Sequence, residues 1–197
     1  MKNPMQRLLL AAAVWMTMAA MAQAQTWTVI ELPSTIDELP AAVEQQLGYP
    51  LDSVPNRNLT HIRLTGQDFR RTSAIHTYNG SNNRHQNMYK LVQKAKVLDL
   101  SELQYNLDNV EHRNGWSGDA PDETFYTLYT IGNALDSLQK MIYPRVATRI
   151  DQSLADCHRL TEVVWPTAVV KFLPSSLFDD CDQLTRMDFP EGVPMIP

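Results

Sequence analysis

The chain has 197 residues, of which 44% are hydrophobic and 20% are charged, so it can bury a core and is not compositionally disordered. Its length allows one ordinary domain or two small ones. The net charge of -5 and the lack of a basic cluster argue against nucleic-acid binding, which requires Lys and Arg to displace phosphate counterions.

Residues 1–24 are predicted to be a signal peptide. Lys2 and Arg7 form a short basic start, and the apolar run that follows is too short to span a bilayer. The small residues of the sequence A-Q-A predict cleavage before Gln25. An uncleaved anchor is disfavoured because the following flank is small and polar. We therefore expect an exported protein, secreted or at the cell surface, with no membrane span after cleavage.

Residues 25–57 are expected to form an N-terminal leader or cap. Ser34 is a plausible helix N-cap with Asp37 three residues on, and Gly48 is a stop signal. Pro40 lies inside this stretch and would break or restart the helix. A connector rich in turn residues then leads to the main domain.

The C-terminal part of the chain repeats an apolar pattern that ends at Pro144, Pro166 and Pro190, at intervals of 22 and 24 residues. The two clearer copies share four apolar core positions, which are Cys157, Leu160, Val163 and Trp165 in one and Cys181, Leu184, Met187 and Phe189 in the next. Such a period is typical of solenoids, whose turns bury their apolar edges against each other. The alternation before each proline predicts short parallel strands.

A second apolar pair in each copy is expected on the far side of the coil. The pair is Val169 and Phe172 in one copy, and Val193 and Ile196 in the next. No polar cap follows the last copy, although solenoids need one. We expect either a partner over this end or a longer product of which the chain is a fragment.

The sequence L-F-D-D-C-D-Q-L-T-R-M-D-F-P-E-G-V resembles the repeat of BspA-like leucine-rich repeat proteins, which are secreted or surface proteins. Residues 58–69 and 94–103 resemble the N-terminal part of the same family. The resemblance implies an α/β leucine-rich repeat solenoid with stacked parallel β-strands, a short array and a helical or irregular N-terminal leader. The implied domain spans 58–197, with an insertion at 102–131 and repeats at 132–153, 154–177 and 178–197.

Two cysteines in an exported chain leave a disulfide open. Cys157 and Cys181 occupy equivalent repeat positions, so their side chains are expected to point the same way. This direction suits a ladder of buried thiols better than a bridge. The resemblance likewise implies a structural core role for these cysteines.

The sequence predicts no catalytic site, no cofactor and no metal site. The five histidines lack metal-ligand spacing, and His76 and His85 flank a polar stretch interpreted as a loop. The insertion contains N-G-W-S-G-D-A-P-D-E, which matches neither a nucleophile elbow nor a calcium loop. A solvated insertion that carries Trp116 is the favoured interpretation.

Protein binding is the expected function, because stacked strands form an extended surface. The candidate surface positions lie between the core positions of the repeats, together with the aromatic residue of the insertion: Lys140, Glu162, Val164, Arg186, Asp188 and Trp116. The family resemblance implies adhesion to a host or neighbouring-cell component. A carbohydrate-binding accessory module is the main alternative, and it requires exposed aromatic residues that form a flat platform. An enzyme that uses the insertion is a third hypothesis.

Overall fold

A computed structural model describes most of the chain beyond the predicted signal peptide. The described residues are 26–69, 83–106, 135–148, 154–170 and 176–189, with the single positions 125, 128, 131, 150 and 173. The predicted signal peptide, Trp116, Phe172, Val193 and Ile196 lie outside the described residues.

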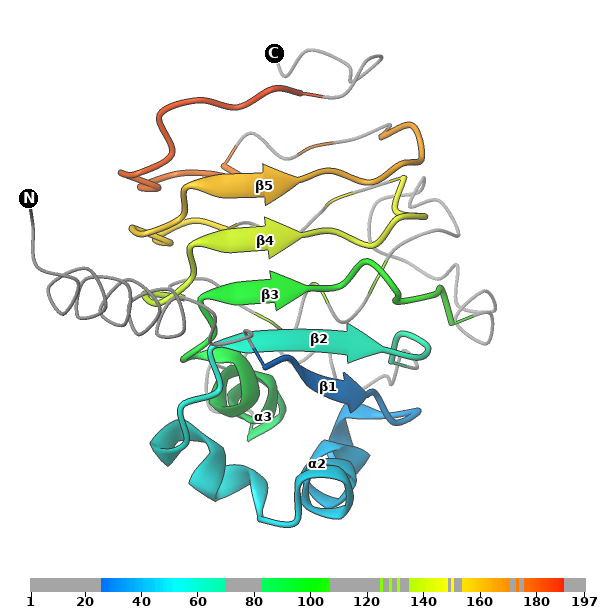
Figure 1. Ribbon diagram of the computed structural model, residues 1–197. Helices are drawn as coiled ribbons and strands as arrows, with labels where there is room; N and C mark the ends of the chain where they lie inside the picture. The colour runs from blue at the N-terminus through cyan, green and yellow to red at the C-terminus, as the bar shows by residue number, and fades with distance from the viewer. Residues whose placement is uncertain are drawn as a thin grey trace, which may run out of the picture.

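Five strands form one sheet in which every neighbouring pair is parallel. Their spatial order equals their order in the sequence (Figure 1): β1 (Thr28–Glu31), β2 (His61–Thr65), β3 (Val97–Asp99), β4 (Lys140–Ile142) and β5 (Glu162–Val164). The chain must therefore return to the same end of the sheet before each new strand begins. This arrangement confirms the predicted α/β class and the parallel strands.

Paired residues of β4 and β5 are 22 positions apart in the sequence, which is the predicted repeat spacing. Lys140 lies opposite Glu162, and the hydroxyl of Thr161 donates to the carbonyl of Gln139, 22 residues earlier. The third copy behaves differently, because residues 184–189 run beside β5 without forming a strand.

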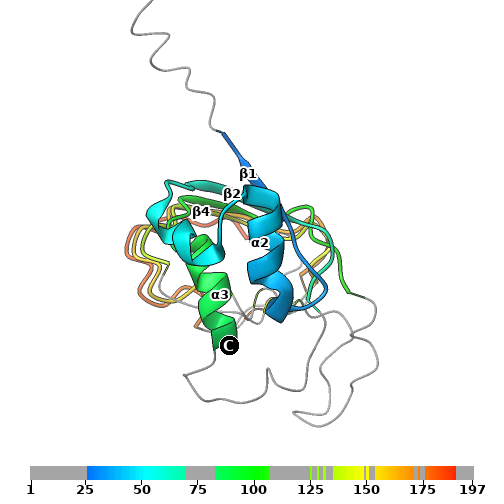
Figure 2. The same cartoon turned by 90° about the horizontal axis from the view of Figure 1, so that it is seen from below.

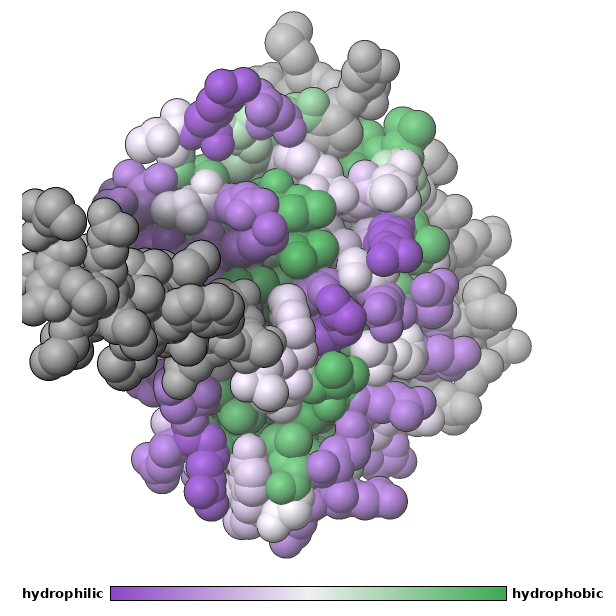
Figure 3. Space-filling view, in the orientation of Figure 1, coloured by the Kyte–Doolittle hydropathy of each residue, from purple (hydrophilic) through white to green (hydrophobic). Residues whose placement is uncertain are grey.

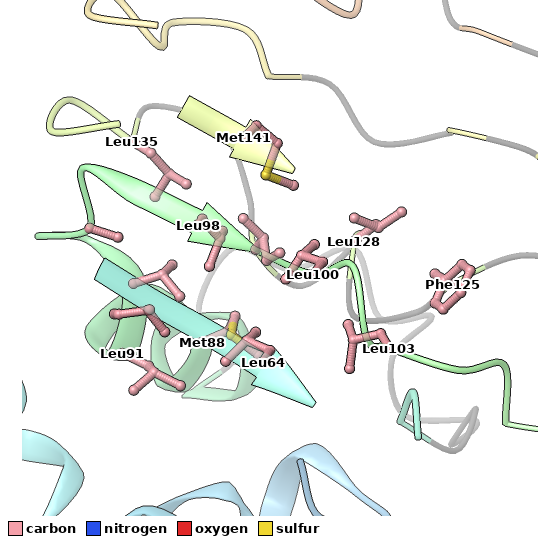
Figure 4. Close-up of a cluster of buried hydrophobic side chains, with 14 of the residues drawn as sticks. Leu64, Met88, Leu91, Leu98, Leu100, Leu103, Phe125, Leu128, Leu135 and Met141 are labelled. Atoms are coloured by element: carbon pink, nitrogen blue, oxygen red, sulfur yellow. The ribbon is translucent and has the colours of Figure 1, made fainter. Parts of the chain in front are cut away.

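Alternate residues of the strands point into a continuous apolar core. Ile62, Leu98 and Met141 lie in register across β2, β3 and β4, and none is more than 1% exposed. In Figure 4, Leu98 and Met141 lie above Met88 and Leu91, which project from the neighbouring helix. Burial of aliphatic side chains contributes about 1.5–3 kcal/mol each, so this row is a main source of stability.

Helices pack at the β1 and β2 end of the sheet (Figures 1 and 2). They are the 3-10 helices η1 (Ile36–Glu38) and η2 (Leu51–Asn56) and the α-helices α2 (Leu39–Leu47) and α3 (Asn83–Val92). Leu39 and Val43 of α2 are fully buried, as is Met88 of α3. These helices close one end of the core from solvent.

The N-cap of the leader's helical segment is displaced by one residue from the prediction. The N-cap is Thr35 rather than Ser34, because the Glu38 carboxylate reaches back to accept the Thr35 N–H at 3.2 Å. Pro40 lies in the first turn of α2, where its missing N–H removes no helical hydrogen bond. Gly48 ends α2 with φ 77°, which confirms the predicted stop.

Three expectations from the sequence were wrong. No strand forms around Met187 and Phe189, although the alternation before Pro190 predicted one. The leader also contributes a strand that the sequence analysis did not predict, because β1 lies within it and pairs with β2. The polar stretch before His85 is not all loop, since α3 begins at Asn83. Val169 is 62% exposed instead of returning to the core, and its neighbour Val170 is fully buried in its place.

The free edge of β1 is covered by the side chain of Gln46 from α2. Its amide nitrogen donates to the Glu31 carbonyl, and its amide oxygen accepts the Glu31 N–H, both at 2.9 Å. The side chain thus replaces the backbone of a sixth strand at this position. Since open edges invite pairing with other chains, Gln46 protects the sheet from edge-to-edge association.

Replacing Gln46 with alanine is expected to lower the free energy of unfolding by about 1 kcal/mol, because two hydrogen bonds to the edge are lost. The variant should also self-associate at high concentration. Urea denaturation and sedimentation velocity measure the two effects. Gln45→Ala is the matched control, because Gln45 is an exposed neighbour on the same helix. Equal behaviour of the two variants would contradict the edge role.

Candidate binding face

The outer face of the sheet carries the side chains that point away from the core. One row crosses all five strands in register: Val29, Arg63, Asp99, Ile142 and Val164. A second row crosses four strands: His61, Val97, Lys140 and Glu162. We call these two rows, with the adjoining residues Trp27, Glu102, Arg186 and Asp188, the outer face.

Most of the predicted surface residues lie on the outer face. Lys140 is on β4, and Glu162 and Val164 are on β5, where the register places them side by side. Arg186 and Asp188 follow in the segment beside β5 and are exposed. The register therefore brings Lys140, Glu162 and Val164 to one side of the sheet, while Arg186 and Asp188 are exposed in the segment that follows β5. Trp116 lies outside the described residues.

Charges on the outer face are paired with each other. The Lys140 ammonium lies 2.6 Å from the Glu162 carboxylate, across the β4–β5 pair. Arg186 contacts Asp188 at 3.2 Å, although both side chains are about four-fifths exposed. Pairs this exposed contribute little to stability, so they chiefly determine the electrostatic pattern of the face.

Apolar side chains interrupt the charges over the later strands. Val164 is 36% exposed and lies in register beside Ile142 of β4. Figure 3 shows hydrophobic atoms over β4 and β5, surrounded by hydrophilic ones. An apolar centre with a charged rim is the pattern of protein interfaces.

The sequence analysis missed an ion pair on the first strands of the outer face. The guanidinium of Arg63 donates to the Asp99 carboxylate at 2.8 Å and lies 3.5 Å from Glu102. The Asp99 side chain is only 3% exposed and also accepts the Ser101 N–H at 2.9 Å. A carboxylate inside the apolar sequence V-L-D-L requires a partner with a positive charge or hydrogen-bond donors. The position of Asp99 in that sequence was therefore a signal that could have predicted the ion pair.

The pKa of Asp99 lies below its ordinary value of 3.8. Burial opposes ionisation, but the hydrogen bonds from Ser101 and the Arg63 guanidinium favour the charged form more strongly. Asp99 therefore remains an ionised acceptor at neutral pH, and it holds Arg63 against the sheet.

The predicted core positions divide into buried and partly buried residues. Cys157 and Leu160 are fully buried. Five of the other core positions are partly buried: Val163, Trp165, Cys181, Leu184 and Met187. Phe189 is 50% exposed.

An aromatic stack links the three copies of the repeat. Tyr143 and Trp165 stack at 5.8 Å between ring centroids, and Phe189 follows at 5.4 Å from Trp165. In the sequence, each of these three aromatic residues directly precedes one of the repeated prolines. Within the described residues, the Tyr143 hydroxyl and the Trp165 indole N–H are buried without a hydrogen-bond partner. The stack therefore contributes packing rather than polar recognition.

Both cysteines are free thiols. Burial raises the pKa of Cys157 to about 11, and burial also raises the pKa of Cys181. The Cys181 thiol donates to the Leu154 carbonyl at 3.2 Å. Thiols held in this protonated state are poor nucleophiles and serve as core residues.

Among the described residues, no group of three or more His, Cys, Asp or Glu side chains is arranged to hold a metal ion. The same part of the chain has no helix with the length and apolar character needed to cross a membrane. His158, next to Cys157, is half-exposed and contacts Asp182 at 3.1 Å.

The fold and the face define an α/β protein with a parallel sheet that is closed by helices at one end. The chain matches no protein-family model, no curated protein sequence and no solved structure. Its function must therefore be inferred from the geometry of its own residues.

Proposed function

We propose that the chain is an exported, non-catalytic leucine-rich repeat protein of the BspA-like kind, which binds a protein partner through the outer face. The partner belongs to the cell surface or to a neighbouring cell. The observation that carries this proposal is the outer face itself, on which the strand register aligns paired charges around exposed apolar side chains.

Three repeated local features support the assignment to a repeat solenoid. Asp156 and Asp180 each precede a cysteine and share the left-handed backbone, with φ of 60° and 56°. The hydroxyl groups of Thr161 and Thr167 donate to carbonyls 22 residues earlier. The aromatic stack adds one ring for each copy. Equivalent residues in equivalent conformations are what stacked repeats require.

Charge pairing supports a protein partner over a nucleic acid or a highly charged polymer. Each cation on the outer face has a carboxylate within reach, so the face has no large field of one sign. Docking a mixed surface of this type depends on complementary charges and on apolar contact at the centre. The apolar centre is provided by Val164 and Ile142.

Reversing two charges on the face tests the proposal. The double variant Glu162→Lys with Arg186→Glu is expected to weaken binding of a partner isolated from a cell-surface fraction by at least about tenfold, through like-charge contacts. Surface plasmon resonance on the purified partner measures the change. Glu44→Lys is the control, because Glu44 is exposed on α2 at the helical end of the molecule. Unchanged affinity in the double variant would rule out this face.

Export has its own test. If the predicted signal peptide is removed, the protein recovered outside the cytoplasm should have a mass that corresponds to a chain starting at Gln25. Intact-mass spectrometry distinguishes this chain from the uncleaved form. Retention of residues 1–24 on the recovered protein would contradict a cleaved signal peptide.

A further inference from the structure

We propose a saccharide-binding site at the β1 end of the outer face, formed by Trp27, Arg63 and Glu102. This activity goes beyond the protein-binding function proposed above and involves residues that the charge-reversal experiment does not alter. We call these three residues the Trp27 site.

The aromatic part of the site is exposed but held in place. Trp27 is 37% exposed and directly precedes β1. Its ring meets the His61 ring in a T-shaped contact at 5.6 Å, and the Arg63 guanidinium covers one face of the indole at 4.9 Å from the centroid. An exposed indole that is already fixed by two neighbours loses little conformational freedom when a ligand packs against it.

Hydrogen-bonding groups stand beside the indole. Arg63 is about one-third exposed, and its guanidinium links the inner carboxylate of Asp99 to the outer one of Glu102. The Glu102 side chain is 48% exposed, so its oxygens remain accessible to a ligand. The site thus offers N–H donors and carboxylate acceptors next to an apolar surface.

The charge arrangement favours a neutral ligand with many hydroxyl groups. Two carboxylates against one guanidinium disfavour anions, and a cation would compete with Arg63 for the indole. A sugar ring displaces neither partner, because its C–H face packs on the face of the indole that Arg63 leaves uncovered. Its hydroxyls both donate to carboxylates and accept from a guanidinium.

An array of neutral oligosaccharides, built from hexoses and N-acetylhexosamines, is the first experiment. Calorimetry with the best-bound oligosaccharide then compares variants. Trp27→Ala is expected to weaken binding at least about tenfold, because a few aromatic residues often contribute most of the binding free energy of a site. Tyr89→Ala should leave binding unchanged, because Tyr89 is an exposed aromatic residue on α3 and has no part in the site.

A second variant keeps the test valid if Trp27→Ala unfolds the protein. Glu102→Gln preserves the shape of a half-exposed side chain and is expected to weaken binding about fivefold through loss of a charged acceptor. The site is overturned if no neutral oligosaccharide binds or if folded Trp27→Ala binds as the wild type does. The assignment of a neutral ligand would be overturned if heparin or hexalysine bound more tightly than the best neutral oligosaccharide and this binding was lost in Trp27→Ala.

Discussion

Replacing Leu98 with alanine is expected to lower the free energy of unfolding by about 3 kcal/mol, the largest stability effect we predict for a single side chain. Leu98 is fully buried at the middle of the sheet, between Ile62 of β2 and Met141 of β4. Figure 4 shows it facing the core above α3. The substitution removes apolar contacts on every side and leaves a cavity that the strands cannot collapse to fill.

Equilibrium denaturation in urea measures this loss. Val29→Ala serves as the control, because Val29 is also an aliphatic strand residue but is 50% exposed on the outer face. We expect that variant to remain within about 0.5 kcal/mol of the wild type. A cost for Leu98→Ala as small as that of the control would mean that the row across β2, β3 and β4 is not the core.

Replacing Asp99 with asparagine is expected to lower the free energy of unfolding by about 2 kcal/mol at pH 7, the typical value of a hydrogen bond to a charged group. Asparagine retains an acceptor for Ser101 but loses the charge that holds Arg63. Because the neighbouring residues remain in place, the difference from the wild type isolates the ionised carboxylate.

The Asp99→Asn difference should depend on pH in one direction. The pKa of Asp99 in the folded state is below 3.8, so its stabilising effect is complete above that pH and is lost as pH falls through the folded value. Urea denaturation of both proteins at pH 7, 5, 4 and 3 measures the difference between their free energies of unfolding. This difference should be the same at pH 7 and 5 and should become smaller below pH 4. A difference that grows on acidification would contradict the lowered pKa.

Asp52→Asn is the matched control for this series. The Asp52 carboxylate lies 2.7 Å from the Lys90 ammonium, yet its side chain is 80% exposed. Exposed ion pairs contribute about 0–1 kcal/mol, so this variant should remain close to the wild type at each pH. The two aspartates thus separate the effect of burial from that of pairing.

Local patterns predicted the parts of the fold that depend on neighbours in the sequence. The alternation around Met141 and Val163 predicted strands, and both lie in them. Gly48 predicted a helix end because a residue without Cβ tolerates the left-handed conformation. Burial of Cys157 and Leu160 followed from the repeat. Val169 shows the limit, since a shift of one residue exchanged it with Val170 in the core.

Long-range pairings decided the parts that the sequence analysis missed. The strand Thr28–Glu31 is short and is soon followed by Pro33 and Ser34, so its pairing with β2 is what identifies it as part of the sheet. The contact between Arg63 and Asp99 joins residues 36 positions apart, and no spacing rule links them. Trp27 likewise gains its neighbours only when β1 and β2 lie side by side.

The sequence by itself determined the α/β class, the positions of β4 and β5 and the side on which Lys140, Glu162 and Val164 point. Those properties arise from the period of the apolar residues, which is a local feature of the sequence and does not depend on which strands pair. Only the tertiary structure decided which charges meet, how Gln46 covers the edge and why Trp27 stays exposed. Those properties depend on register and on the approach of distant segments, which local preference does not encode.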